Sequence, residues 1–219
     1  MILSILLACC SYFETYTQEC TRALQFISEN PAFSEILCNN IGKNDAVIAE
    51  SIVAPEISQY SAIENQMQIR TLYLLYVSSG VSNFSIGFLQ MKPSFAEQIE
   101  MLVRADGSLK RKYSKLIITK GDIKETRRIR IERLCSLRWQ LEYLSAFMQI
   151  ANKRIGSLVK GKGKRIKYLA TMYNGGISLK INEIEYILNT KQFPHWGFTK
   201  FNYADCALEF YKKINESKV

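Results

Sequence analysis

The sequence contains few of the residues that bind metal ions in proteins. Among its 219 residues there is one histidine, His195, and the six cysteines never occur in a C-x-x-C spacing. A zinc site needs several histidine or cysteine ligands, and His195 has no ligand residue near it in the chain. We therefore expect no metal site.

A long apolar run is also absent. The apolar stretch at the N-terminus, up to Ala8, is far shorter than the roughly 20 residues of a transmembrane helix. No lysine or arginine precedes it, yet it resembles a clipped secretory signal that ends in Leu6-Leu7-Ala8-Cys9. This ending is similar to the lipobox of bacterial lipoproteins, in which the cysteine is acylated. We predict that residues 1–10 form an export leader, and acylation of Cys9 and its absence both stay open.

Four cysteines lie outside this leader, namely Cys20, Cys38, Cys135 and Cys206. In an oxidising compartment a Cys20–Cys38 disulfide is one alternative, and buried free thiols are the other. The spacing of these residues does not decide between the two.

Acidic residues are fewer than basic ones. The chain has 29 lysines and arginines against 20 aspartates and glutamates, which gives a net charge of +9. A basic surplus favours acidic polymers as partners: nucleic acid, an anionic membrane, or a cell wall that carries carboxylates and phosphates. It does not choose between them.

Hydrophobic periodicity predicts one mainly helical domain over residues 11–219, without internal repeats or a long linker. Helices are expected over residues 15–29, 43–53, 58–79, from Pro93 onward, 122–154, 178–189 and 203–215, with a basic loop at 160–165. The best strand candidate is 116–118. The helix over 122–154 should be the central one, and its basic early turns should form a solvated face. Its apolar seam consists of Leu134, Leu137, Leu141, Leu144, Met148 and Ala151.

Three short stretches carry candidate chemistry: Ile-Val-Ala-Pro-Glu at 52–56, Gly-Phe-Leu-Gln at 87–90 and Tyr-Asn-Gly-Gly at 173–176. Glu56 follows an apolar run, and loss of water around a carboxyl raises its pKa, as a general acid near neutral pH requires. Each stretch also has an ordinary structural interpretation. Pro55-Glu56 could begin a helix, and Asn-Gly-Gly is a common helix C-cap.

The order of these stretches resembles that of the lytic transglycosylases of glycoside hydrolase family 23 and their goose-type lysozyme relatives. Those proteins typically carry Gly-Leu-Met-Gln followed by a proline, and later Ala-Tyr-Asn-Ala-Gly. Here the matching stretches are Gly-Phe-Leu-Gln-Met-Lys-Pro at 87–93 and Ala-Thr-Met-Tyr-Asn-Gly-Gly at 170–176. The resemblance implies an α+β, predominantly helical lysozyme-like domain with a long central helix and at most a small strand-bearing lobe.

The resemblance also implies roles for individual residues. Glu56 would be the only acid/base, while Gln90 and the backbone from Ser85 to Gly87 would hold sugar hydroxyls and the N-acetyl group. Tyr173 would orient the acid or the acetamido group, and Asn174 would bind substrate. The family usually has Glu-Ser at the catalytic position, which Glu50-Ser51 also offers. We place the acid at Glu56 because Glu50 lies more than one helical turn earlier, and the long segment from Glu56 to Gly87 suggests a helical insertion.

The implied activity is cleavage of the β-1,4 bond between N-acetylmuramic acid and N-acetylglucosamine, with 1,6-anhydromuramyl products and no metal or organic cofactor. The implied partner is the peptidoglycan glycan strand, bound by a monomer in the bacterial cell envelope, periplasmic or lipid-anchored through Cys9. Two alternatives share the fold: a hydrolytic lysozyme and a catalytically silent peptidoglycan-binding module. A nucleic-acid-binding helical protein is a third alternative, but we expect no nucleic acid, because that function gives no account of Gln90 or Tyr173.

Overall fold

The computed structural model describes residues 10–119, 121–156 and 158–217. Within these ranges the chain is predominantly helical and forms no strand. Extended backbone pairs only at two isolated bridges, between Ile86 and Met91 and between Phe193 and Phe201. The predicted leader with Cys9 lies outside the described residues, apart from Cys10.

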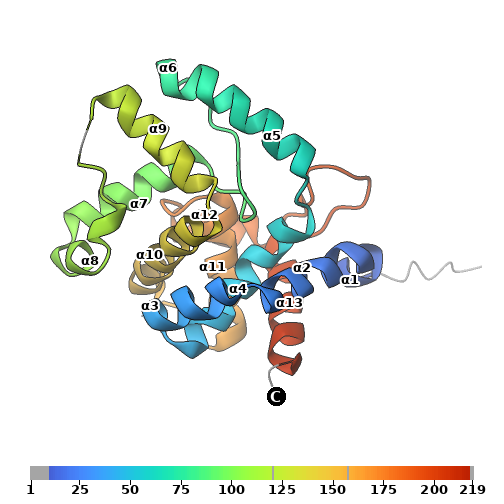
Figure 1. The fold of residues 1–219 in the computed structure, drawn as a ribbon. Helices are drawn as coiled ribbons and strands as arrows, with labels where there is room; N and C mark the ends of the chain where they lie inside the picture. Colours follow the sequence, from blue (N-terminus) through green and yellow to red (C-terminus); the bar gives the residue numbers. More distant parts are fainter. Residues whose placement is uncertain (1–9, 120, 157, 218–219) are drawn as a thin grey trace, which may run out of the picture.

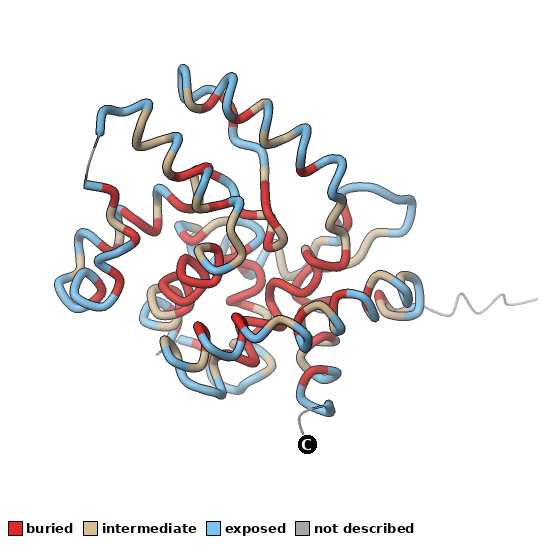
Figure 2. Tube along the Cα trace, viewed as in Figure 1, coloured by how far each residue is buried: buried red, intermediate tan, exposed pale blue. Residues whose placement is uncertain are grey.

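The core of the lower layer is built around two buried helices, α4 (Lys43–Ser58) and α10 (Leu137–Ile155) (Figures 1 and 2). Nearly every side chain of α4 from Ala46 onward is buried, as is every side chain of α10 from Gln140 to Met148. Helical stretches that are buried on all sides belong to the interior of a domain. The helices that surround these two are α2 (Thr17–Glu29), the π-helical η1 (Phe33–Cys38), α11 (Lys162–Gly175) and α13 (Tyr203–Ser217). Short helices α1 (Tyr12–Thr15), α3 (Asn39–Ile41) and α12 (Ile181–Ile187) complete this layer.

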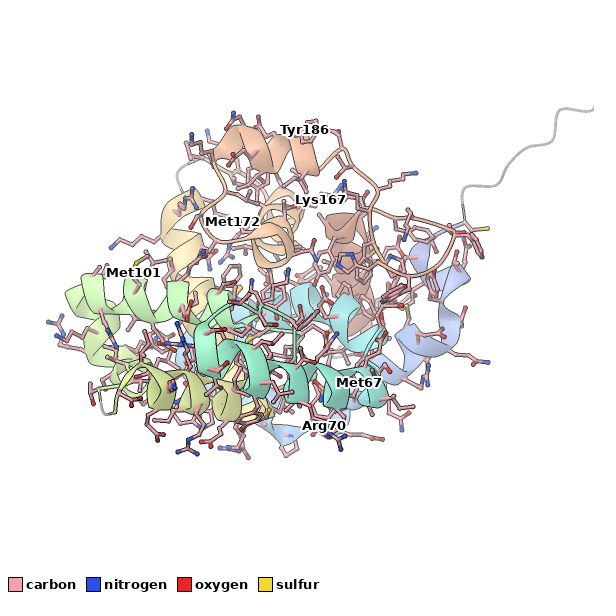
Figure 3. The ribbon with its side chains drawn as sticks, turned by 90° about the horizontal axis from the view of Figure 1, so that it is seen from above. Met67, Arg70, Met101, Lys167, Met172 and Tyr186 are labelled. Atoms are coloured by element: carbon pink, nitrogen blue, oxygen red, sulfur yellow. The ribbon has the colours of Figure 1, made fainter. Side chains whose placement is uncertain are left out.

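The upper layer begins with one continuous helix made of α5 (Ala62–Thr71), the π-helical η2 (Leu72–Tyr76) and α6 (Val77–Ser79). After an irregular segment come α7 (Pro93–Ala105), α8 (Gly107–Lys112), the 3-10 turn η3 (Ser114–Leu116) and α9 (Ile123–Leu134) (Figure 1). Seen from above, α5 with Met67 lies on one side of the molecule, and α12 with Tyr186 lies on the other (Figure 3). The long segment between Glu56 and Gly87 is thus mostly helical, and along α5 it buries only Asn65.

The predicted helix over 122–154 is wrong as a single element, because the structure divides it into α9 and α10 at Cys135 and Ser136. Ser136 has extended backbone angles, φ −103° and ψ 121°, and α10 begins directly after it. The apolar seam is confirmed on both sides of the break, since Leu134 and Leu141 are fully buried. The central helix is therefore the shorter α10.

The strand predicted over 116–118 is also wrong. Leu116 closes the 3-10 turn η3, and its carbonyl accepts a hydrogen bond from the Arg133 guanidinium at 2.8 Å. The carbonyl of Ile118 accepts one from Arg104 at 2.7 Å. Side-chain donors thus satisfy backbone groups that a sheet partner would otherwise have bonded.

A buried ion network joins the two layers. It corrects the expectation of a solvated basic face on α9 for Arg130, whereas Lys124 and Arg128 are exposed as expected. Arg130 is only 6% exposed, and its guanidinium forms a two-point contact with Glu100 of α7, at 3.0 and 2.7 Å. It also bonds Glu97 at 3.0 Å and the hydroxyl of Tyr76 in η2. Tyr143 of α10 donates to Glu100 at 2.7 Å. One cation therefore links four elements.

The described cysteines, Cys10, Cys20, Cys38, Cys135 and Cys206, are free thiols, so the Cys20–Cys38 disulfide is not formed in this structure. Within the same ranges, no helix combines the length and apolar content that crossing a bilayer requires.

Candidate active site

Glu56 lies in the last turn of α4, with Pro55 in the interior of that helix. The interpretation in which Pro55-Glu56 begins a helix is therefore wrong. The helix continues through the proline because Ile52, Val53 and Ala54 are completely buried, so packing offsets the one backbone hydrogen bond that proline cannot donate. This packing fixes the backbone from which the Glu56 carboxyl extends.

Burial raises the pKa of the Glu56 carboxyl to about 7. A hydrogen bond from Asn174 Nδ2 at 3.3 Å, the positive charge of Lys92 and the hydroxyl of Tyr203 oppose this rise and lower the pKa in part. The C-terminal end of a helix carries partial negative charge, which further disfavours an ionised carboxylate there. Glu56 is thus poised to exchange a proton near neutral pH.

A cleft of about 530 Å³ contains Glu56, and segments far apart in sequence form its lining. Of the predicted site residues, Glu56, Ser85, Gln90, Tyr173 and Asn174 all line it. The remaining lining residues come from α5, the segment before α7, α7 itself, the end of α11 and the loop before α13; they include Glu64, Gln68, Asn83, Phe84, Lys92, Gln98, His195 and Trp196. Glu50, the alternative acid, is 2% exposed and lies outside the cleft.

The turn from Ile86 to Met91 forms the part of the cleft that the Gly-Phe-Leu-Gln motif predicted. Its ends pair through two backbone hydrogen bonds of 3.0 Å, in which the amides of Ile86 and Met91 each donate to the carbonyl of the other. Gly87 and Gln90 both have positive φ, 73° and 49°, and Gln90 is a non-glycine residue in this region. Such a backbone persists only where the surroundings hold it.

Three buried side chains hold the turn from behind. The Gln140 amide bonds at both ends: its Nε2 donates to Ile86 O at 2.9 Å, and its Oε1 accepts from Leu89 N at 3.2 Å. Asn65 Oδ1 accepts from Gly87 N at 2.7 Å. The Tyr173 hydroxyl donates to Leu89 O at 2.6 Å. Helices α5, α10 and α11 therefore fix one short turn.

These contacts revise two of the expected roles. Gly87 does not line the cleft, because its N–H is bonded to Asn65 and its carbonyl accepts from Gln90 Nε2 at 2.9 Å. Tyr173 lines the cleft, but its hydroxyl proton is committed to Leu89 O. Burial, together with the nearby Glu56 charge, raises the pKa of Tyr173. Gly87 is thus a structural residue, and Tyr173 positions the turn.

We expect Gly87→Ala to lower the free energy of unfolding by about 2–4 kcal/mol, because the new methyl group combines backbone strain with a clash. A Cβ at Gly87 would lie 2.4 Å from Gln140 Nε2 and 2.4 Å from Leu134 O. Urea denaturation measures the loss. Gly163→Ala is the matched control, because Gly163 lies in α11 and its Cβ would meet nothing within 4 Å. An equal response of the two variants would contradict this account of the turn.

Several residues of the site were not predicted from the sequence. Lys92 lies inside the Gly-Phe-Leu-Gln-Met-Lys-Pro stretch at 87–93, but its residue type gave no reason to select it. Gln140 is one of several polar residues in α10, and only its position directly before Leu141 of the apolar seam could have drawn attention to it. Tyr203 of α13 donates to Ile52 O at 2.8 Å and lies near Glu56, and no local pattern marks it.

Comparisons of the chain with protein-family models, with curated proteins and with solved structures give no match. The described residues also contain no cluster of three or more histidine, cysteine or acidic side chains placed to hold a metal ion. Functional inference for this chain therefore depends on the geometry of the cleft and on its motifs.

Proposed function

We propose that the protein is a lytic transglycosylase that cleaves the β-1,4 bond between N-acetylmuramic acid and N-acetylglucosamine in peptidoglycan, within a lysozyme-like fold. The observation that carries the proposal is a half-buried carboxyl with a pKa of about 7 in a cleft lined by Gln90, Tyr173 and Asn174. Glu56 and Asn174 contact each other there although they lie more than 100 positions apart. The stretches that carry the lining residues follow one another along the chain in the same order as the family motifs. The bacterial envelope is the corresponding location.

The reaction needs one carboxyl to act first as acid and then as base. Protonated Glu56 gives its proton to the glycosidic oxygen as the bond to the muramyl anomeric carbon breaks. The substrate's own acetamido group stabilises the cationic centre, so a second carboxylate is not needed. Ionised Glu56 then removes the proton from the muramyl 6-hydroxyl, whose oxygen closes the 1,6-anhydro ring. Glu56 ends protonated, ready for the next strand.

Within the cleft, the remaining residues supply binding and order. Gln90 Nε2 is bonded to Gly87 O, which leaves its Oε1 directed by the turn for a substrate hydroxyl or amide. Asn174 donates to Glu56, which orients the carboxyl before the proton is transferred. The hydrogen bonds that hold the turn from Ile86 to Met91 keep Gln90 in place, so that it need not rearrange during the reaction.

One observation favours hydrolysis as a second candidate function. Glu64 of α5 is exposed and lines the same cleft, so a second carboxylate is present. In hydrolytic glycosidases such a group can activate water or stabilise the cationic centre. A silent peptidoglycan-binding module would keep the cleft without turnover.

Digestion of purified sacculi, followed by mass spectrometry of the products, distinguishes these functions. A transglycosylase releases anhydromuropeptides, which are lighter by one water than the products of a lysozyme. A lysozyme that uses Glu64 would lose activity in Glu64→Gln, whereas a transglycosylase would keep it. Binding to sacculi without any released product would contradict both enzymatic functions.

We expect kcat/KM to fall about tenfold for each pH unit above pH 7, because only protonated Glu56 can donate to the leaving oxygen. The folded carboxyl has a pKa of about 7, so its acid form predominates below that value and is lost above it. A pH–rate profile on a soluble glycan measures the effect. A profile that stays flat up to pH 9 would contradict the role of Glu56.

A further inference from the structure

Lys92 is a cation inside the cleft that the proposed reaction does not use. It lies at the N-cap of α7, directly before Pro93, and lines the cleft together with Glu56 and Gln90. Of the described residues that line the cleft, Lys92 alone is a lysine or arginine. Its side chain is exposed, so it is free to meet a ligand.

Lys200, whose ammonium lies beside the loop that lines the cleft, is engaged by the protein itself. Lys200 donates to the carbonyls of Pro194 and His195, at 2.6 and 2.8 Å, and so holds the loop that carries Trp196. In contrast, across residues 10–119, 121–156 and 158–217, no carboxylate forms an ion pair with Lys92. Lys92 therefore remains available for a charged partner from outside the chain.

The backbone beside Lys92 is already satisfied, so recognition would fall to the ammonium group. The amides of Phe95 and Ala96 donate to Lys92 O at 3.0 and 3.3 Å, and Ser94 N donates to Asn83 Oδ1 at 3.0 Å. The first N–H groups of α7 are thus bonded within the protein. A ligand at this point meets a single mobile ammonium, which suits a point contact with one anionic group.

The position of Lys92 also has a chemical consequence for the acid. Its positive charge lowers the pKa of Glu56, which opposes the protonated form that the proposed reaction needs. An anion bound to Lys92 would cancel this effect and leave burial as the dominant influence on Glu56. Substrate binding and readiness of the acid would then be coupled through one side chain.

We propose that Lys92 binds a carboxylate of the glycan and makes the cleft select acidic strands over neutral polymers of N-acetylglucosamine. This inference rests on the proposed function, whose substrate it specifies. In peptide-free glycan the carboxylate belongs to the lactyl group of the muramyl residue. In peptide-bearing glycan the lactyl group is amidated, and the carboxylate belongs to the peptide stem.

Calorimetric binding in the Glu56→Gln background, where no turnover is expected, tests the proposal with three tetrasaccharides. Chitotetraose has no carboxylate, a peptide-free tetrasaccharide of alternating N-acetylglucosamine and N-acetylmuramic acid has lactyl carboxylates, and the peptide-bearing form has stem carboxylates. We expect at least one acidic ligand to bind about tenfold more tightly than chitotetraose, as a charge-assisted contact allows. Lys92→Gln should remove this preference, and Lys92→Arg should keep part of it.

The outcomes separate this inference from the function on which it rests. A preference for the peptide-free ligand identifies the lactyl group, and a preference for the peptide-bearing ligand identifies the stem. Lys124→Gln, a change of an exposed lysine on α9, should leave the preference intact. If Lys92→Gln weakened all three ligands equally, or none, the selectivity proposal would be overturned alone. If none of the three bound to the protein with Lys92 intact, the proposed function would fail as well.

Discussion

Glu56→Gln should lower the rate of peptidoglycan cleavage at least about a hundredfold while the fold stays intact. Glutamine keeps the shape of the side chain and its contact with Asn174, but it neither donates nor accepts the proton that the reaction transfers. Release of soluble muropeptides from sacculi at pH 6 measures the loss. Activity within a few fold of the wild-type protein would exclude Glu56 as the acid.

The same substitution should change stability in a way that depends on pH. The fold raises the pKa of Glu56 from 4.5 to about 7, so the folded state favours the neutral acid. The stability contributed by this preference is present below pH 4.5 and is lost as the pH rises to about 7. Glu56 is half-buried, so solvent screens part of this effect. We therefore expect the free energy of unfolding of Glu56→Gln to exceed that of the wild-type protein by about 2 kcal/mol at pH 8 and by little at pH 4.

Two further carboxyl substitutions complete this test. Glu64→Gln changes an exposed carboxyl on α5 in the same cleft and should leave transglycosylation intact. Glu50→Gln changes a buried side chain outside the cleft, so any effect on activity should follow its effect on stability. Loss of cleavage in folded Glu50→Gln, with Glu56→Gln unaffected, would move the acid to Glu50.

The convergence of the three motif stretches could be predicted from their types and order. A carboxyl after an apolar run, a Gly-x-x-Gln turn and a Tyr-Asn pair do line one cleft. Local signals also placed the start of α7 at Pro93, because proline fits the first turn of a helix. The seam of α10 followed from its periodicity, since Leu141 and Leu144 are fully buried.

The predictions that were wrong concern features that depend on tertiary contacts. Neither proline nor glycine lies at Cys135 or Ser136, so local propensity favours one unbroken helix there. The break brings Leu134 O close to Gly87 and starts α10 so that Gln140 reaches the turn. The loop predicted over 160–165 is helical from Lys162 onward, and Arg165 bonds Asp45 of α4 at 2.8 Å. No window of sequence around either residue contains its partner.

The buried network around Arg130 follows the same logic, because a run of basic residues predicts a solvated face unless carboxylates from other elements meet it. Glu97 and Glu100 lie one turn apart on α7, some 30 positions earlier in the chain. Only the packing of α7 against α9 brings these charges together. In the sequence, the only indication of this network is the pair Glu97 and Glu100 on a helix whose other face is apolar.

Arg130→Met should destabilise the protein by about 3–5 kcal/mol, the cost of leaving a buried carboxylate without its partner. Glu100 is 3% exposed and would keep the hydrogen bond that the Tyr143 hydroxyl donates to it at 2.7 Å. Denaturant unfolding at pH 7 measures the change. The matched control is Arg128→Met on the same helix. Arg128 is exposed and pairs with Glu125 and Glu132, so its replacement should destabilise the protein far less than that of Arg130.

A double variant separates the charge from the packing in this network. Glu100→Gln in the Arg130→Met background removes the unpaired charge and retains an acceptor for Tyr143, so part of the lost stability should return. The network also connects η2 to α7, and the segment after η2 leads to Phe84 and Ser85 in the cleft. Arg130→Met should therefore also weaken binding of glycan at temperatures where the variant is still folded. If Arg130→Met cost no more than Arg128→Met, the network would not hold the upper layer, and the cleft wall would depend on apolar packing instead.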